Sequence, residues 1–182
     1  MMGTRTRVSI EAFERFVQQP EHGDRQFELI GGEIVEVVSN NYSSAVAARL
    51  LVEIGMAVKR LDAGFVTGAD GGYEIGSERY IPDVAYISRQ RQPAPSREPY
   101  NPTPPDLAVE VLSPSNDDSD MRLKISNYLA ASTTVWVVDP ERQQVEVHLP
   151  GQPGRRYGLD DTLDGGAVLP GLSIPVRDIF PE

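Results

Sequence analysis

The run Asp106-Leu-Ala-Val-Glu-Val-Leu112 constrains the fold of this 182-residue chain more than any other segment. It is short and apolar at almost every position, which is typical of a β-strand buried on both faces of its sheet. A strand of this kind needs a packing layer above the sheet and another below it. We therefore expect a layered fold with this segment near its centre.

Three segments have the apolar periodicity of α-helices, namely residues 9–17, residues 41 to about 61, and residues 119–131. After the second segment, Gly64 stands where a helix C-cap is expected. For the third segment, Ser119 or Asp118 is the expected N-cap. Helices of this length can supply the layers that the central strand requires.

Short strands account for the other ordered segments. Residues 26–30 and 33–38 are joined by Gly31-Gly32, a strong hairpin signal because both glycines can adopt a positive φ. Further strands are expected at residues 65–67, 73–75, 81–87, 134–138 and 145–149. This order of elements predicts an α/β fold of the α+β type, a sandwich with a central mixed β-sheet flanked by helices.

The chain length favours a single domain spanning residues 1–182. Its core is expected at about residues 9–149, followed by a Gly/Pro-rich C-terminal extension with short strands at residues 150–182. The proline-rich residues 93–105 favour an extended loop.

Charge and composition exclude several function classes. The 17 Lys and Arg residues against 27 Asp and Glu residues give a net charge of −10, which repels nucleic acid unless basic groups are concentrated locally or metal ions intervene. The chain has no cysteine, which excludes a cysteine nucleophile, and only 2 histidines, which nearly excludes a zinc site. Apolar runs are too short to cross a membrane, and residues 1–10 lack a signal-peptide core, so we expect a bacterial-type cytoplasmic protein.

Two carboxylates break the apolar pattern. Glu110 lies between Val109 and Val111, and a lone buried carboxylate seldom occurs without a partner or a metal ion; the alternative is an edge strand with Glu110 facing water. Asp83 follows Pro82 at the beginning of an expected strand, where it could also simply end a turn. On neighbouring strands, the two carboxylates would meet and offer the hard oxygen ligands that Mg²⁺ prefers.

Lys124 is the third anomaly. It lies three residues after Met121 and four before Tyr128, so it projects from the apolar stripe of its helix. The alternative interpretation is a lysine whose stem packs on the protein while its ammonium reaches water. An ammonium beside the carboxylates would instead stabilise developing negative charge or orient a water. Glu28, in the first hairpin strand, is expected to face solvent but could reach the same site.

Four segments resemble, in order, motifs of the Uma-two family of restriction endonucleases. They are Phe27-Glu-Leu-Ile-Gly-Gly-Glu-Ile34, Tyr80-Ile-Pro-Asp-Val-Ala-Tyr86, Pro105-Asp-Leu-Ala-Val-Glu-Val-Leu-Ser-Pro-Ser115, and Asp120-Met-Arg-Leu-Lys-Ile-Ser-Asn-Tyr128 leading to Val135-Trp-Val-Val-Asp-Pro140. Together the four segments span most of the chain. The last two are specific, because a Glu-Val-Leu-Ser-Pro-Ser run followed by Asp, then Lys, then Tyr is hard to explain by chance. The family resembles the PD-(D/E)xK nuclease superfamily, which implies a restriction-endonuclease-like sandwich.

The resemblance also implies roles for the anomalous residues. Asp83 and Glu110 match the metal-binding carboxylates, with Mg²⁺ (or Mn²⁺) as the cofactor, and Lys124 and Glu28 complete the catalytic set. The superfamily usually places the lysine two residues after the acidic residue, but position 112 is leucine here, so Lys124 on the following helix is the match. Family members often carry a histidine near the start of the long helix, where this chain reads Asn-Asn-Tyr-Ser from residue 40.

The expected function is therefore a metal-dependent endonuclease that hydrolyses DNA phosphodiester bonds. Two alternatives stay open. One is a catalytically inactive nuclease fold retained as a binding or assembly module, which the acidic surface and the absent histidine favour. The other is a metal-dependent hydrolase of a small phosphate or nucleotide, which would explain the lack of an obvious basic stripe. DNA is the expected partner, with no membrane contact, and a homodimer is suggested only by analogy with other nucleases of this fold.

Overall fold

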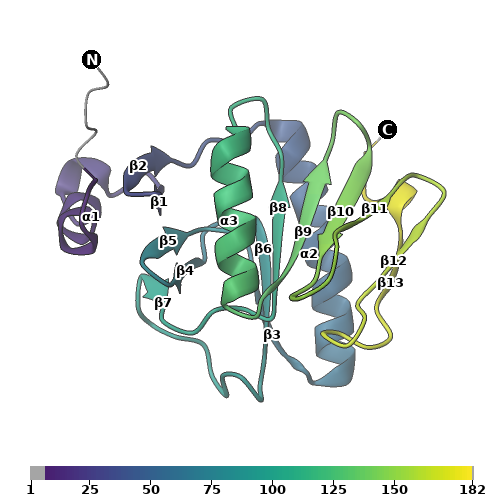
Figure 1. Ribbon diagram of the computed structural model, residues 1–182. Helices are drawn as coiled ribbons and strands as arrows, with labels where there is room; N and C mark the ends of the chain where they lie inside the picture. The colour runs from purple at the N-terminus through teal and green to yellow at the C-terminus, as the bar shows by residue number, and fades with distance from the viewer. Residues whose placement is uncertain (1–6, 182) are drawn as a thin grey trace.

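The computed structural model describes residues 7–181, which form helices and strands arranged in layers (Figure 1). The α-helices are α1 (Ile10–Val17), α2 (Asn41–Leu61) and α3 (Asp118–Ala130), and short 3-10 helices occur at Pro20–His22 and Val176–Asp178. The strands are β1 (Phe27–Ile30), β2 (Glu33–Glu36), β3 (Gly64–Thr67), β4 (Gly72–Ile75), β5 (Glu78–Tyr80), β6 (Val84–Ser88), β7 (Tyr100–Asn101), β8 (Leu107–Val111), β9 (Thr134–Asp139), β10 (Gln144–His148), β11 (Arg155–Tyr157), β12 (Thr162–Asp164) and β13 (Ser173–Pro175).

The larger sheet is the mixed sheet that the sequence predicts. Its six strands follow the order β11-β10-β9-β8-β6-β3, so β8 is an interior strand. β8 runs parallel to β9, with Glu110 opposite Val137, and antiparallel to β6. A second, five-stranded sheet has the order β2-β1-β5-β4-β7 and is made from strands between residues 27 and 101. β12 and β13 form a separate hairpin.

Helices cover both faces of the six-stranded sheet, with α3 in front of it and α2 behind it in the view of Figure 1. The alternation of side chains along β8 follows these two layers. Val109 packs in the apolar cluster that contains Leu50 of α2, whereas Ala108 packs in the cluster that contains Met121 of α3. Glu110 shares the face of Ala108, and this face lies under α3.

The five-stranded sheet is held at the side of α3. Its β1-β2 hairpin turns at Gly31 and Gly32, whose φ angles of 60° and 82° confirm the predicted glycine turn. Phe27 and Leu29 of β1 pack on Phe13 of α1. The residues that alternate with them on β1 therefore point to the opposite side, toward α3.

Pro82 divides the residues that the sequence predicts as one strand over 81–87. β5 ends at Tyr80 and β6 begins at Val84, and the two strands belong to different sheets. A proline has no N–H to donate to a strand ladder, which explains the interruption. Asp83 therefore lies in the three-residue connection between the sheets and not at the start of a continuous strand.

Two predicted helix caps are also wrong. The C-cap of α2 is Asp62, with a left-handed φ of 48°, and Gly64 instead begins β3. Gly64 is needed there because a Cβ atom would lie 2.1 Å from the carbonyl oxygen of Ile87. The N-cap of α3 is Asp117, one residue before the earlier of the two predicted positions.

The residues that follow position 150 contribute to the core. Leu163, Leu169 and Phe180 are buried in the same apolar cluster as Leu50 of α2. The single domain with a core at about residues 9–149 stays a prediction, and its residues 1–6 and 182 lie outside the described part of the chain. Over residues 7–181, the structure contains no helix whose length and hydrophobicity would allow it to cross a membrane.

Candidate functional site

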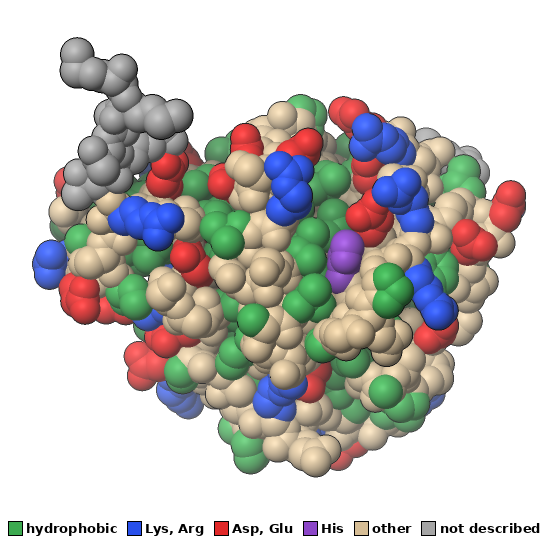
Figure 2. Space-filling model, in the orientation of Figure 1, with side chains coloured by type: hydrophobic (Ala, Val, Ile, Leu, Met, Phe, Trp, Pro, Cys, Tyr) green, Lys and Arg blue, Asp and Glu red, His purple; other side chains and the backbone are tan. Residues whose placement is uncertain are grey.

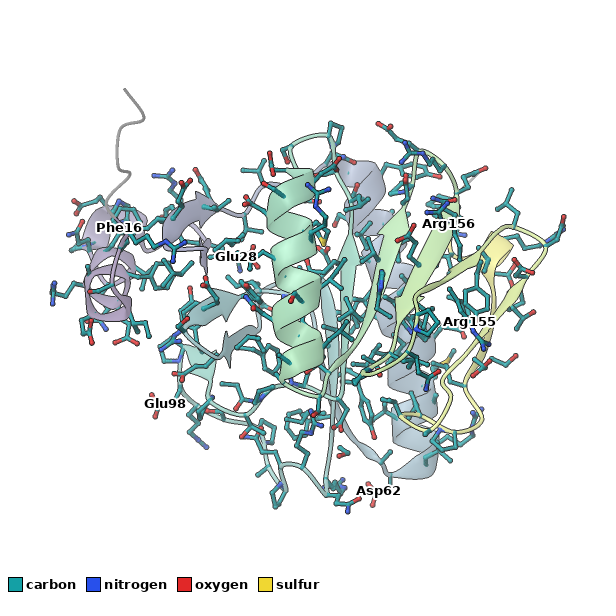
Figure 3. All side chains as sticks on the ribbon, viewed as in Figure 1. Phe16, Glu28, Asp62, Glu98, Arg155 and Arg156 are labelled. Atoms are coloured by element: carbon teal, nitrogen blue, oxygen red, sulfur yellow. The ribbon has the colours of Figure 1, made fainter. Side chains whose placement is uncertain are left out.

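The four residues singled out by the sequence line one cavity of about 150 Å³. Glu28 comes from β1, Asp83 from the connection before β6, Glu110 from β8 and Lys124 from α3. Figure 3 labels Glu28 beside α3, at the place where the five-stranded sheet approaches that helix. The structure therefore brings together side chains that lie far apart along the sequence.

Lys124 is held between two carboxylates. Its Nζ lies 2.9 Å from Oε1 and 3.2 Å from Oε2 of Glu28, and 2.8 Å from Oε2 of Glu110. All three side chains are at most 8% exposed. The same Nζ lies 5.3 Å from the centroid of the Tyr80 ring, within the range of a cation–π contact. The ammonium is thus fixed inside the protein and does not reach toward water.

Both oxygens of the Glu110 carboxylate accept a hydrogen bond from α3. Its Oε2 accepts the Lys124 hydrogen bond, and its Oε1 accepts one from the hydroxyl of Tyr128 at 2.9 Å. Burial raises the pKa of Glu110 to about 7; the Lys124 ammonium opposes this shift, whereas the charges of Glu28 and Asp83 add to it. Because β8 is an interior strand, the alternative of a Glu110 that faces water on an edge strand is wrong.

Backbone N–H groups hold the other two carboxylates. The amide of Val111 donates to Oδ2 of Asp83 at 2.7 Å, which places Asp83 against the end of the strand that carries Glu110. The amide of Ile81 donates to Oε1 of Glu28 at 2.6 Å. Burial also raises the pKa of Asp83, an effect that the Val111 hydrogen bond and the Lys124 charge oppose.

The expectation that Glu28 faces solvent is wrong. Phe27 and Leu29 occupy the face of β1 that packs on α1, so Glu28 must point to the other face. That face is closed by α3 because the five-stranded sheet docks against this helix. Ile30, which shares the face of Glu28, is buried as well.

The donor set of the cavity fits a hard divalent cation. Three carboxylates face a single ammonium, and the raised pKa values of Asp83 and Glu110 show that their negative charge is poorly solvated. Over residues 7–181, no group of three or more His, Asp or Glu side chains is arranged around a common metal position. A cation here would therefore rely on two carboxylates and complete its coordination with water or substrate, as Mg²⁺ commonly does.

Sequence reasoning missed one tyrosine that holds a carboxylate of this site. Tyr128 was interpreted only as part of the apolar stripe of its helix, yet its hydroxyl reaches Glu110. The ring of Tyr80 lies near Lys124, whereas its hydroxyl pairs with Asn127 outside the carboxylate cluster. The position of Tyr128, one helical turn after Lys124, was a usable signal because residues four apart lie on the same face of a helix.

Neither histidine of the chain, His22 or His148, lines this cavity. At the start of α2, the side chain of Asn40 accepts a hydrogen bond from the amide of Ser43 at 2.9 Å, and the Ser43 hydroxyl donates to the carbonyl of Leu112 at 3.1 Å. The polar residues that occupy this region therefore cap the helix and attach it to the end of β8.

The lining of the cavity is acidic. Asp117 and Asp120 add their carboxylates to it, as does Glu36, which is paired with Arg25, while Lys124 is the only lysine or arginine in the described lining. On the face drawn in Figure 2, the Lys and Arg side chains form separate patches interspersed with Asp and Glu. A polyanionic substrate would thus meet few basic groups near the cavity.

Comparisons with known proteins place this geometry in context. The sequence profile of the Uma2 family, described as "Putative restriction endonuclease", matches residues 13–177. No match was found among curated proteins. One similar solved structure is the crystal structure of "a putative nuclease belonging to DUF820" from Anabaena variabilis, with a TM-score of 0.82 and 21% sequence identity over 95% of this chain and 97% of that chain. This likeness confirms the predicted fold class.

Proposed function

Since this chain belongs to the Uma2 family of putative restriction endonucleases, we propose that it is a metal-dependent endonuclease that hydrolyses phosphodiester bonds in DNA. The observation that carries the proposal is the contact of Lys124 with both Glu28 and Glu110 in a cavity that Asp83 also lines. Buried charged groups cost free energy, so the burial of Glu28, Glu110 and Lys124 beside the half-buried Asp83 is more readily explained by chemistry than by stability.

Asp83 and Glu110 are the proposed ligands of Mg²⁺ or Mn²⁺. A divalent cation held by these carboxylates would polarise a phosphate oxygen and lower the pKa of an attacking water. The Val111 amide orients Asp83, and Tyr128 and Lys124 orient Glu110, so both carboxylates have fixed positions before a substrate binds. This preorganisation is the contribution of the protein to the site.

Lys124 supplies the positive charge of the site. Its ammonium lies in a water-poor cavity, where it stabilises the negative charge that develops on the phosphate oxygens during hydrolysis. Glu28 holds this ammonium in place and is itself fixed by the amide of Ile81. We assign Glu28 to the positioning of Lys124 and of a nearby water.

A hydrolase of a small phosphate or nucleotide is the second candidate. It is favoured by the acidic lining to which Asp117 and Asp120 contribute, which repels a long polyanion more than a small one. An inactive binding module is the third outcome, and it would leave the buried ion pairs without a chemical role.

Cleavage assays distinguish these candidates. The full chain is incubated with plasmid DNA, oligonucleotides and nucleotides in the presence of Mg²⁺, Mn²⁺ or a chelator. We expect DNA cleavage that requires the metal and that is lost in Asp83→Asn, Glu110→Gln and Lys124→Met. The matched controls Glu53→Gln and Lys59→Met change exposed residues of α2 and are expected to cleave normally.

Three results would contradict the proposal. Cleavage in the chelator would exclude the metal, and unchanged cleavage by the three site variants would exclude the assigned residues. Hydrolysis of nucleotides without hydrolysis of DNA would favour the second candidate. The melting temperature of every variant is measured, and activities are compared only at temperatures where each variant is folded.

A further inference from the structure

Tyr128 is a buried polar side chain in contact with the proposed metal site. It is 0% exposed and lies one helical turn after Lys124 on α3. Its hydroxyl donates to Oε1 of Glu110 at 2.9 Å, the oxygen that Lys124 does not contact. A buried hydroxyl without a partner is costly, so this hydrogen bond is strongly favoured in the folded protein.

Two donors on one helix define the orientation of the Glu110 carboxylate. Lys124 holds Oε2 and Tyr128 holds Oε1, and the two donors lie four residues apart on the same face of α3. The terminal torsion of a glutamate is broad and has no strong preference of its own. With only one of the two hydrogen bonds, the carboxylate could rotate about that torsion while it kept the remaining contact.

We propose that Tyr128 is a positioning residue whose hydroxyl fixes the plane of the Glu110 carboxylate, so that Glu110 and Asp83 present oxygen atoms to one divalent cation. The inference rests on the proposed function, because it assumes that these two carboxylates bind the cation. Tyr128 itself does not touch the cation or the substrate. It acts through Glu110.

Tyr80 provides a matched control within the same chain. It is also 0% exposed, and its ring contacts the Tyr128 ring edge-on with a centroid separation of 5.3 Å. Its hydroxyl accepts a hydrogen bond from Nδ2 of Asn127 at 2.7 Å and makes none to Glu110. Substituting either tyrosine by phenylalanine removes a single buried hydroxyl and leaves the ring in place. Only the Tyr128 hydroxyl contacts a carboxylate of the site, namely that of Glu110.

The test is a calorimetric titration of the full chain with Mn²⁺ alone, without substrate. Removing a group that orients a metal ligand typically weakens metal affinity by about 10- to 100-fold. We expect Tyr128→Phe to show a loss in this range, and Tyr80→Phe to stay within about twofold of the original chain, since it leaves Glu110 untouched. Both variants are compared well below their melting temperatures, so that each is folded during the titration.

The outcomes separate this inference from the proposed function. If the original chain binds no Mn²⁺, the proposed metal site is wrong. If it binds Mn²⁺ and Tyr128→Phe binds equally well, the metal site stands and the role of Tyr128 is wrong. Equal losses of affinity in the two phenylalanine variants would also overturn the inference, because they would indicate a general loosening of the packing.

Cleavage kinetics supply an independent readout. For Tyr128→Phe, the Mn²⁺ concentration that gives half-maximal cleavage should rise by the same factor as the dissociation constant. The rate at saturating Mn²⁺ should return close to that of the original chain, because excess cation restores occupancy. A purely structural role would lower the melting temperature without moving the half-maximal Mn²⁺ concentration, and that result would contradict the proposal.

Discussion

The Nζ atom of Lys124 lies 2.8 Å from Oε2 of Glu110, although the two residues are 14 positions apart and belong to different elements. In the nuclease superfamily that the sequence resembles, the lysine usually lies two residues after the acidic residue. In this chain that position is Leu112, and its amide donates to the carbonyl of Val138. The ammonium therefore reaches the carboxylate from the helix above the strand. The integrity of this pair depends on how α3 docks on the sheet.

Lys124→Met should strongly destabilise the protein. The change leaves Glu28 and Glu110 buried without their cation, and breaking a buried ion pair in this way typically costs about 3–5 kcal/mol. The measurement is the free energy of unfolding in urea at neutral pH, followed by the fluorescence of Trp136, the only tryptophan of the chain.

The chain contains 2 lysines, so Lys59→Met is the natural control for this measurement. Lys59 is exposed in the last turn of α2, and its loss should change the free energy of unfolding by less than about 1 kcal/mol. A Lys124→Met variant as stable as Lys59→Met would contradict the description of a buried, paired ammonium.

The N-cap of α3 should be worth a measurable share of stability. The amides of Ser119 and Asp120 donate to Oδ1 of Asp117 at 2.7 and 3.3 Å. Replacing such a cap by alanine typically costs about 0.5–2 kcal/mol, whereas serine is an equally good cap. Urea unfolding should therefore show a loss for Asp117→Ala and recovery for Asp117→Ser. Equal losses in both variants would show that the carboxylate matters for a reason other than capping.

The segment after residue 150 should unfold together with the rest of the chain. Leu163 is 0% exposed and packs in the cluster of α2, so Leu163→Ala should cost about 2–5 kcal/mol. Leu159 is 39% exposed, and Leu159→Ala should change stability by only about 0.5 kcal/mol. Calorimetry should show one transition for each variant. A separate transition shifted only in Leu163→Ala would instead indicate an independently folding C-terminal segment.

DNA cleavage, if the proposed function holds, should weaken as the salt concentration rises. Contacts to phosphates release counterions, so affinity falls when salt increases from about 50 to about 200 mM. The net charge of −10 leaves few basic groups for such contacts, and the expected slope is therefore shallow. The measurement is kcat/KM for an oligonucleotide across this range, with the melting temperature recorded in the same buffers. Cleavage that increases with salt would contradict the prediction.

Local patterns in the sequence predicted the elements that carry the site. The apolar run around Glu110 predicted an interior strand because such runs need cover on both faces, and β8 has that cover. The spacing of Lys124 from Met121 and Tyr128 predicted an inward-facing lysine, since helical spacing depends only on neighbours along the chain. The structure confirms both placements.

The remaining features depend on contacts between distant segments. Glu28 is buried because the five-stranded sheet docks beside α3, and no periodicity within β1 specifies that docking. Asp83 lies between two sheets, whereas the residues around it suggested one strand. The role of Tyr128 was hidden for a different reason: its ring satisfies the apolar pattern, so only the three-dimensional position of its hydroxyl distinguishes it from ordinary core packing.

Residues 81–83 connect the two sheets whose side chains together surround Lys124. Glu28 belongs to one sheet and Glu110 to the other, and Asp83 lies on the short link between them. A chain in which only the six-stranded sheet is formed keeps Asp83, Glu110 and Lys124 but lacks Glu28, the second carboxylate that holds the ammonium. The ammonium of Lys124 is therefore held by carboxylates from both sheets only when the two sheets are docked together beside α3, so the charge balance of the cavity depends on that docking.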